Sequence, residues 1–172
     1  MTVWRDRTIE ERNLLNSAFC AVVIWSLARG YQTEELQSGT PPRGLPLELA
    51  FVGASFVLRG KTREALPRVV RTSLPTWIQE HPLERSAVAK GVAVLRPYVR
   101  EGVLLAARQN LVKLGKCGEI EPDDKAVKSV AKYTKKATAE VTDCVAKAMF
   151  VGRWLYKSGT PSTVMDLVGV RP

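Results

Sequence analysis

The strongest constraint on the fold of this chain is a stretch near its N-terminus that is apolar on almost every side of a helix. Thr8 and Glu11 precede it three residues apart, so each side chain can bond the other's free backbone N–H, and we expect a helix from Thr8 to Gly30. Its apolar positions are Leu14, Leu15, Ala18, Phe19, Val22, Val23, Trp25 and Leu27. Such a helix needs cover from several sides, which predicts the central helix of a mainly α, compact helical domain.

The size and charge of the chain limit what it can be. A length of 172 residues suits a single domain, residues 1–172, and 45% apolar with 25% charged residues is typical of a globular protein. The 26 Lys and Arg exceed the 17 Asp and Glu, giving a formal charge of +9. This surplus favours polyanions or an acidic protein surface as partners.

Residues 47–58 form a second apolar stretch, and we expect a helix there. Gly60 stands where a helix C-terminal glycine belongs, and Thr62 is placed to cap a short helix that restarts behind it. The segment between Pro67 and Pro75 does not indicate one conformation, because an extended chain and a helical turn both fit it.

A dense charge cluster follows the second apolar stretch. One interpretation is that its cations complement the negative end of the helix dipole. The other is a docking surface, because a rigid helix end would present arginines, which make directional contacts with carboxylates. The partner-binding residues of this second interpretation, here called the docking edge, are Arg59, Arg63, Glu64, Leu66, Pro67 and Trp77.

Further elements follow from periodicity. Residues 84–109 repeat apolar positions every three or four residues around Pro97, which predicts one kinked helix or two stacked helices. Residues 111–122 predict a small β-hairpin, and a helix followed by such a hairpin is winged-helix-like. Residues 123–158 carry an apolar seam typical of one long helix, and Thr160 caps a short final helix.

A lysine-rich segment lies within the expected long helix. Residues 125–136 hold five lysines and no acidic residue. Four of these lysines share one side of a helix and are here called the lysine face: Lys125, Lys128, Lys132 and Lys136. The lysine face can neutralise phosphates in nucleic acid, or it can be a solvated surface opposite the apolar seam.

The sequence offers little for catalysis. His81 is the single histidine, and the three cysteines, Cys20, Cys117 and Cys144, lie far apart without metal-ligand or redox spacing. We therefore expect no catalytic residue, no metal and no cofactor. Unpaired cysteines and a charged N-terminus indicate a cytoplasmic protein, and apolar runs far shorter than about 20 residues predict no membrane span.

Four blocks together resemble the middle-component family of bacterial three-component ABC systems. They are "LLNSAFCA" at 14–21, "FVLRGKTREALP" at 56–67, "TWIQEHP" at 76–82 and "GVRP" at 169–172. The chain departs from the family pattern at Ser17, where proline commonly follows the asparagine, and by one extra residue before the terminal glycine. The resemblance implies an accessory subunit encoded between an SMC- or Rad50-like ABC ATPase and an effector, often a nuclease. Such systems are proposed to act against phages and plasmids, and Lamassu-type systems are similar in organisation.

Two functions compete at this stage. The first is a non-catalytic adaptor that links the ATPase to the effector and meets DNA through the complex. The alternative is a stand-alone winged-helix-like DNA-binding protein that uses the lysine face. Because the family has no established catalytic residues, the resemblance transfers none to this chain, and an enzyme is the remotest of the alternatives.

Overall fold

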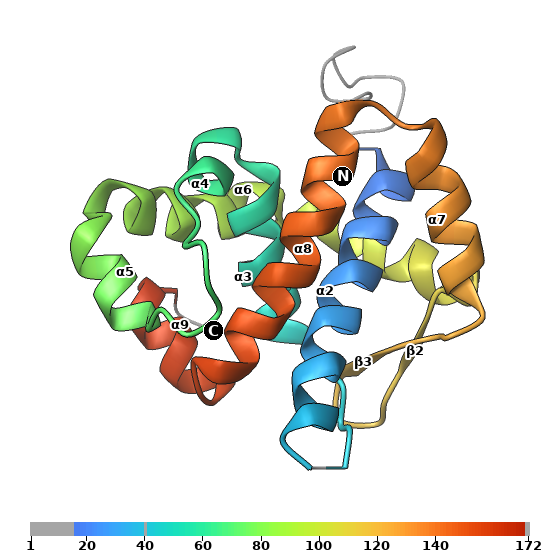
Figure 1. Ribbon diagram of the computed structural model, residues 1–172, viewed down its shortest axis with the longest axis horizontal. Helices are drawn as coiled ribbons and strands as arrows, with labels where there is room; N and C mark the ends of the chain where they lie inside the picture. The colour runs from blue at the N-terminus through green and yellow to red at the C-terminus, as the bar shows by residue number, and fades with distance from the viewer. Residues whose placement is uncertain (1–15, 40, 171–172) are drawn as a thin grey trace.

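The computed structural model describes residues 16–39 and 41–170 (Figure 1). Its elements are α2 (Ser17–Gln37), β1 (Leu45–Pro46), α3 (Leu47–Leu58), α4 (Gly60–Glu64), α5 (Leu74–Glu80), α6 (Pro82–Arg108), β2 (Val112–Leu114), β3 (Glu119–Pro122), α7 (Ala126–Lys136), α8 (Ala139–Lys157) and α9 (Pro161–Val168). The predicted fold class, mainly α with a small β-hairpin, is confirmed.

Helix α2 is the central helix, as its apolar circumference predicts. It packs against α6, α8 and α3 and touches β3, and its side chains from Phe19 to Ala28 are all buried. The predicted end at Gly30 was wrong. The helix begins at Ser17, because the side chain of Asn16 accepts a hydrogen bond from the N–H of Ala18 at 2.8 Å, and the expected start at Thr8 lies outside the described residues.

Gly30 does not end α2, which continues to Gln37. A Cβ at Gly30 would overlap the backbone of Met149 in α8, and a Cβ at Gly152 would overlap the carbonyl oxygen of Leu27. The two helices therefore cross with their backbones in contact, each through a glycine of its own. Close approach, and not helix termination, explains the glycine at position 30.

The predicted helix at 47–58 is confirmed as α3, but two details after it were wrong. Gly60 is the first residue of α4 and has no left-handed conformation, since extended Arg59 turns the chain between the two helices. Thr62 caps nothing: it is fully buried inside α4 and donates a hydrogen bond to Glu84 of α6 at 2.6 Å. Thr62 thus fixes α4 onto α6.

The segment that the sequence left undecided is a series of turns followed by α5. Ser73 caps α5 by accepting from the N–H of Thr76. One helix, α6, then spans the predicted 84–109 region with Pro97 inside it, so the single-helix alternative is correct. Ser55 of α3 donates to the carbonyl of Val88 at 2.9 Å and holds α3 against α6.

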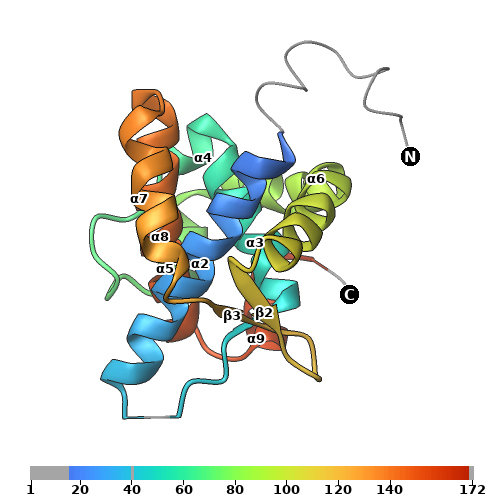
Figure 2. The same cartoon turned by 90° about the vertical axis from the view of Figure 1, so that its right-hand side faces the viewer.

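The predicted hairpin is confirmed as β2 and β3, which pair antiparallel with Leu114 opposite Ile120. The sequence analysis missed a third strand. Leu45 and Pro46 form β1, which pairs antiparallel with β3 and gives the sheet order β1-β3-β2. Figure 2 shows this sheet beneath α6, on the side of the molecule away from α5.

The predicted long helix over 123–158 was wrong, because the chain breaks into α7 and α8. Ala137 is extended, and Thr138 caps α8 by accepting from the N–H of Val141. Val127, expected in the apolar seam, is 39% exposed. The final helix, α9, begins at Pro161 behind a Thr160 cap as predicted.

Candidate functional site

Arg63, the centre of the predicted docking edge, lies inside the protein. Its side chain is 9% exposed and is bound on three sides. Its Nε donates to Asp143 at 2.8 Å, one terminal nitrogen donates to Glu140 at 3.2 Å, and the other donates to the carbonyl of Val57 at 2.8 Å. Arg63 therefore joins α4, the end of α3 and the first turns of α8.

Cys144 lies beside this arginine in α8 and is buried. Burial raises the pKa of its thiol and outweighs the positive charge of Arg63, which lowers it. The thiol is thus held neutral at physiological pH, which agrees with the predicted role of a small hydrophobic side chain.

Leu66 and Trp77 of the docking edge are also buried. The ring of Trp77 packs against Phe56 and Trp154, and its indole N–H donates to the carbonyl of Ala65 at 2.8 Å. Trp154 donates in the same way to the carbonyl of Thr72 at 2.6 Å. Two indoles therefore fix both ends of the turn segment 65–73 to the core.

The rest of the docking edge remains accessible: Arg59 and Glu64 are exposed and Pro67 is half-buried. The fixed segment 65–73 adds Arg68 and Arg71, which are exposed, and Val69, which is 57% exposed. The sequence analysis missed these three residues. The sequence contains them in the "RVVR" motif between two prolines. Their exposure could not be predicted from this motif, because the segment is held in place by the indoles of Trp77 and Trp154.

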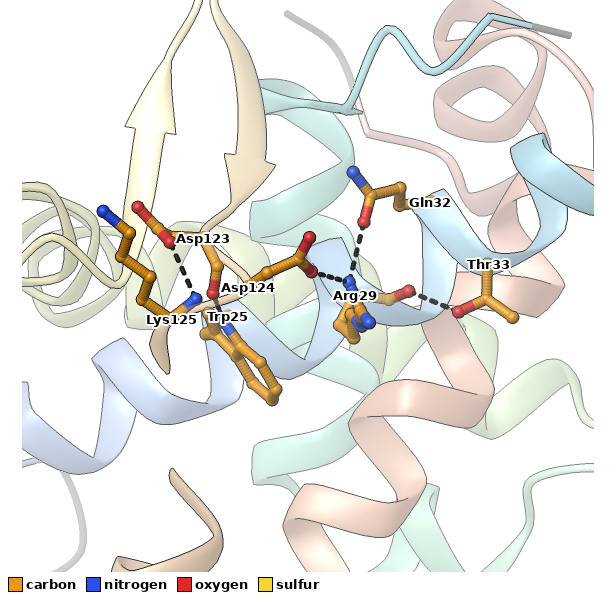
Figure 3. Close-up of polar contacts among 7 residues, drawn as sticks. All are labelled: Trp25, Arg29, Gln32, Thr33, Asp123, Asp124 and Lys125. Carbon is orange, nitrogen blue, oxygen red and sulfur yellow. Dashed lines mark hydrogen bonds and ion pairs between the residues drawn. The ribbon is translucent and has the colours of Figure 1, made fainter. Parts of the chain in front are cut away.

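The turn directly before α7 is anchored to the central helix (Figure 3). The indole N–H of Trp25 donates to the carbonyl of Asp123 at 3.3 Å, and Arg29 forms an ion pair with Asp124. The side chain of Asp123 accepts from the N–H of Lys125 at 2.8 Å. The start of the lysine face is therefore held by contacts with α2, which lies more than 90 residues earlier in the chain.

All four residues of the lysine face are exposed: Lys128, Lys132 and Lys136 lie on α7, and Lys125 stands directly before its first residue. Ala126 and Val130 form the buried side of this helix. In the described part of the chain no ion pair involves these lysines. The nearby carboxylates are engaged elsewhere, since Asp124 pairs with Arg29 and Asp143 pairs with Arg63. The lysines are therefore available to an external anion.

Two of the lysines border a shallow pocket between α7 and the start of α8. Its volume is about 560 Å³, and its lining includes Lys132, Lys136, Tyr133 and the α8 cap Thr138. Hydroxyl groups and ammonium groups are donors that phosphate oxygens accept. The end of the lysine face thus places two ammonium groups beside the hydroxyl groups of Tyr133 and Thr138.

The remaining candidates for chemistry carry no such arrangement. His81 lies between α5 and α6 against the ring of Trp77, and Cys117 is exposed in the hairpin turn. Within residues 16–39 and 41–170 no three His, Cys, Asp or Glu side chains gather where they could hold a metal ion. None of the described helices has the length and apolarity to span a membrane.

Comparison with known proteins gives one match. The family model described as ABC-three component (ABC-3C) system Middle Component 3 matches residues 4–172. The chain belongs to this family. No curated protein and no solved structure matched the chain.

In this middle component the two candidate surfaces lie on opposite sides of the fold. Figure 1 places α5 at one end of the long axis and α7 at the other, with α4, α8 and α2 between them. The docking edge is built on α4 and α5, and the lysine face on α7. The geometry therefore allows both surfaces to be occupied together.

Proposed function

We propose that this middle component is a non-catalytic adaptor that links an SMC- or Rad50-like ABC ATPase to an effector, often a nuclease. The complex acts in the cytoplasm against phages or plasmids and has a Lamassu-like organisation. The observation that carries the proposal is the separation of two exposed basic surfaces on one rigid frame. Membership in a three-component family implies partner proteins.

The docking edge is the proposed protein-binding side. Arg59 and Glu64 are exposed on it, and Arg68, Val69 and Arg71 extend it along a segment that the indoles of Trp77 and Trp154 hold in place. A fixed segment loses little conformational entropy on binding, which favours a specific interface. Arg63, Leu66 and Trp77 support this edge from below and maintain its shape.

The lysine face is the proposed nucleic-acid side. It would lie on DNA that the ATPase already holds, because its lysines are exposed and unpaired within the described chain. Such contacts follow the phosphate backbone and carry no sequence information. The trigger for the complex would therefore be read by another subunit.

The test is to tag this chain in its native operon, purify it at moderate salt and identify its partners by mass spectrometry. We expect an ABC ATPase and a second protein at a fixed ratio. A double variant, Arg68→Glu with Arg71→Glu, should reduce recovery of at least one partner, whereas Lys90→Glu with Arg108→Glu provides a control of equal charge change elsewhere on the surface. Recovery of the chain alone would refute the adaptor.

The alternative is a stand-alone DNA-binding protein, and one observation favours it. A winged helix places a short strand after its first helix, and this strand pairs with the hairpin that follows the recognition helix. The order α2, β1, α3, α6, β2, β3 and the sheet order β1-β3-β2 fit that description, with α4 and α5 inserted. In this arrangement the recognition helix is α6, whereas the lysine face lies on α7.

Binding of the isolated chain to duplex DNA discriminates between the two functions. If the chain is a stand-alone DNA-binding protein, we expect tight binding whose affinity falls steeply as salt rises. If it is an adaptor, we expect weak binding by the isolated chain and stronger binding by the assembled complex. Fluorescence anisotropy with a labelled duplex at several salt concentrations measures both.

A further inference from the structure

A groove runs along α6 on a surface that neither the docking edge nor the lysine face includes. It lies between α6, the start of α3, β2 and the end of α9, and its volume is about 760 Å³. Figure 2 shows α6 beside the hairpin, with α3 next to both. Val103 and Met165 are buried residues of its lining, while Leu104 and Leu114 are about half exposed.

The shape of the groove fits a helix. Its α6 wall extends from Ala89 to Leu104, a distance of roughly 22 Å at 1.5 Å per residue. A second helix of about four turns has this length. Ala89 and Ala93 lie one turn apart on the wall, and small side chains at that spacing let another helix approach closely.

The charges of the groove select the chemistry of the occupant. Arg96 and Arg100, one helical turn apart on α6, both line the groove and are exposed. Within the described residues no ion pair involves either arginine. Glu48 in the first turn of α3 is the acidic member of the lining. The α6 wall is thus positive and complements carboxylates. The wall therefore offers two cations beside an apolar floor.

We propose that this groove receives an acidic amphipathic helix of a partner protein. Leucine-type side chains of that helix at three- and four-residue spacing cover Val103, Leu104 and Leu114, and its Asp or Glu side chains pair with Arg96 and Arg100. A nucleic acid suits the groove less well, because phosphates gain nothing from the exposed apolar side chains. The inference relies on the proposed function for one point, that a protein partner exists.

The experiment places a photo-crosslinking amino acid at Leu104 of the tagged chain in its native operon, with exposed Val69, which does not line the groove, as a second labelled position. After irradiation of the purified complex, the crosslinked peptide is sequenced by mass spectrometry. We expect the Leu104 adduct to contain a helical segment with acidic residues on one side and apolar residues on the other. An adduct with DNA, with a second copy of this chain or with a segment that is not acidic would overturn the proposal.

A charge exchange supplies the second measurement. Arg96→Glu with Arg100→Glu should reduce partner recovery at least tenfold, and replacing the acidic residues of the crosslinked segment with lysine should restore it. Lys90→Glu with Arg108→Glu changes the same charge on α6 outside the groove and should leave recovery unchanged. An intact complex without any Leu104 adduct overturns the groove proposal alone. Absence of any complex overturns the adaptor function and the groove partner together.

Discussion

Helices α7 and α8 follow each other in the chain and share one apolar repeat in the sequence, yet they occupy very different environments. Helix α8 crosses α2 with backbone in contact at Gly152, and its carboxylates Glu140 and Asp143 are committed to Arg63. Helix α7 buries little more than Ala126 and Val130 and leaves its lysines unpaired within the described chain. The same periodicity therefore accompanies a core helix and a peripheral one.

The difference teaches that small residues and distant charges decide how deep a helix lies. Gly152 and Ala148 let α8 approach α2, whereas α7 has no glycine. A charged residue on α8 meets a partner from α4, and a charged residue on α7 meets solvent. The break at Ala137 thus separates carboxylates that pair inside the protein from lysines that face solvent.

The largest expected effect comes from adding a side chain where the backbones of α2 and α8 touch. Gly152→Ala adds a methyl group that overlaps the carbonyl oxygen of Leu27, and backbone cannot move aside as a flexible side chain can. We expect a loss of at least about 3 kcal/mol in the free energy of unfolding, or failure to fold. Urea unfolding measures this loss.

The matched change on α7 is Ala131→Val at an exposed position, which should change stability by about 0.5 kcal/mol or less. Equal effects of the two substitutions would show that α8 does not lie deeper than α7.

The second effect is a loss of stability on replacing Arg63, which pairs with Glu140 and Asp143 of α8. Arg63→Met keeps much of the side-chain volume but removes three hydrogen bonds, two of them to carboxylates. Because Glu140 and Asp143 remain partly solvated, we expect a loss of about 2 kcal/mol. Thermal unfolding followed by circular dichroism measures it. Arg59→Met at the exposed neighbouring position is the control, and a similar loss there would contradict the structural role of Arg63.

The third effect is a pH dependence at the other end of α8. Glu34 of α2 is buried and pairs with Arg153 and Lys157. Burial alone would raise the pKa of Glu34, but the hydrogen bonds and charges of the two cations outweigh it and hold the pKa below its ordinary value of 4.5. Stability from this group is therefore complete above about pH 4.5 and is lost as pH falls through the lower folded-state pKa.

Glu34→Gln removes the titrating group, so the variant should lose less stability than the wild type between neutral pH and pH 3. Denaturant midpoints at several pH values compare the two proteins. Parallel curves would mean that Glu34 has the same pKa in the folded and unfolded chains.

The smallest effect on stability should come from α7. Lys128→Gln with Lys132→Gln removes two exposed charges and should change the free energy of unfolding by about 0.5 kcal/mol or less. The slope of log affinity against log salt for DNA binding by the complex should decrease by about 2, one for each lost phosphate contact. The subunits should stay assembled. Loss of assembly instead would place these lysines on a protein interface.

Local signals in the sequence predicted much of the fold. The Thr160 cap, the hairpin turn and the apolar stretch of α3 depend on residues within a few positions of one another, and all were correct. Helical spacing also relates the lysines of the lysine face, three of which lie on α7 with Lys125 directly before it.

The environment of the docking edge could not be predicted in this way. The burial of Arg63 depends on Glu140 and Asp143, almost 80 residues further along the chain. The fixed segment 65–73 depends in part on Trp154, and the groove on α6 needs α9 to close its end. Each of these three features forms where segments far apart in the sequence come into contact, and sequence periodicity does not predict such contacts.

The central position of α2 also sets an order of events during synthesis. Its permanent cover comes from α6 and α8, and the last residue of α8 follows the last residue of α2 by roughly 120 residues, or about 6–24 s at typical rates of translation. During that interval the apolar circumference of the helix has left the ribosome before the helices that enclose it. The nascent chain is therefore most prone to aggregation before its C-terminal third has been made.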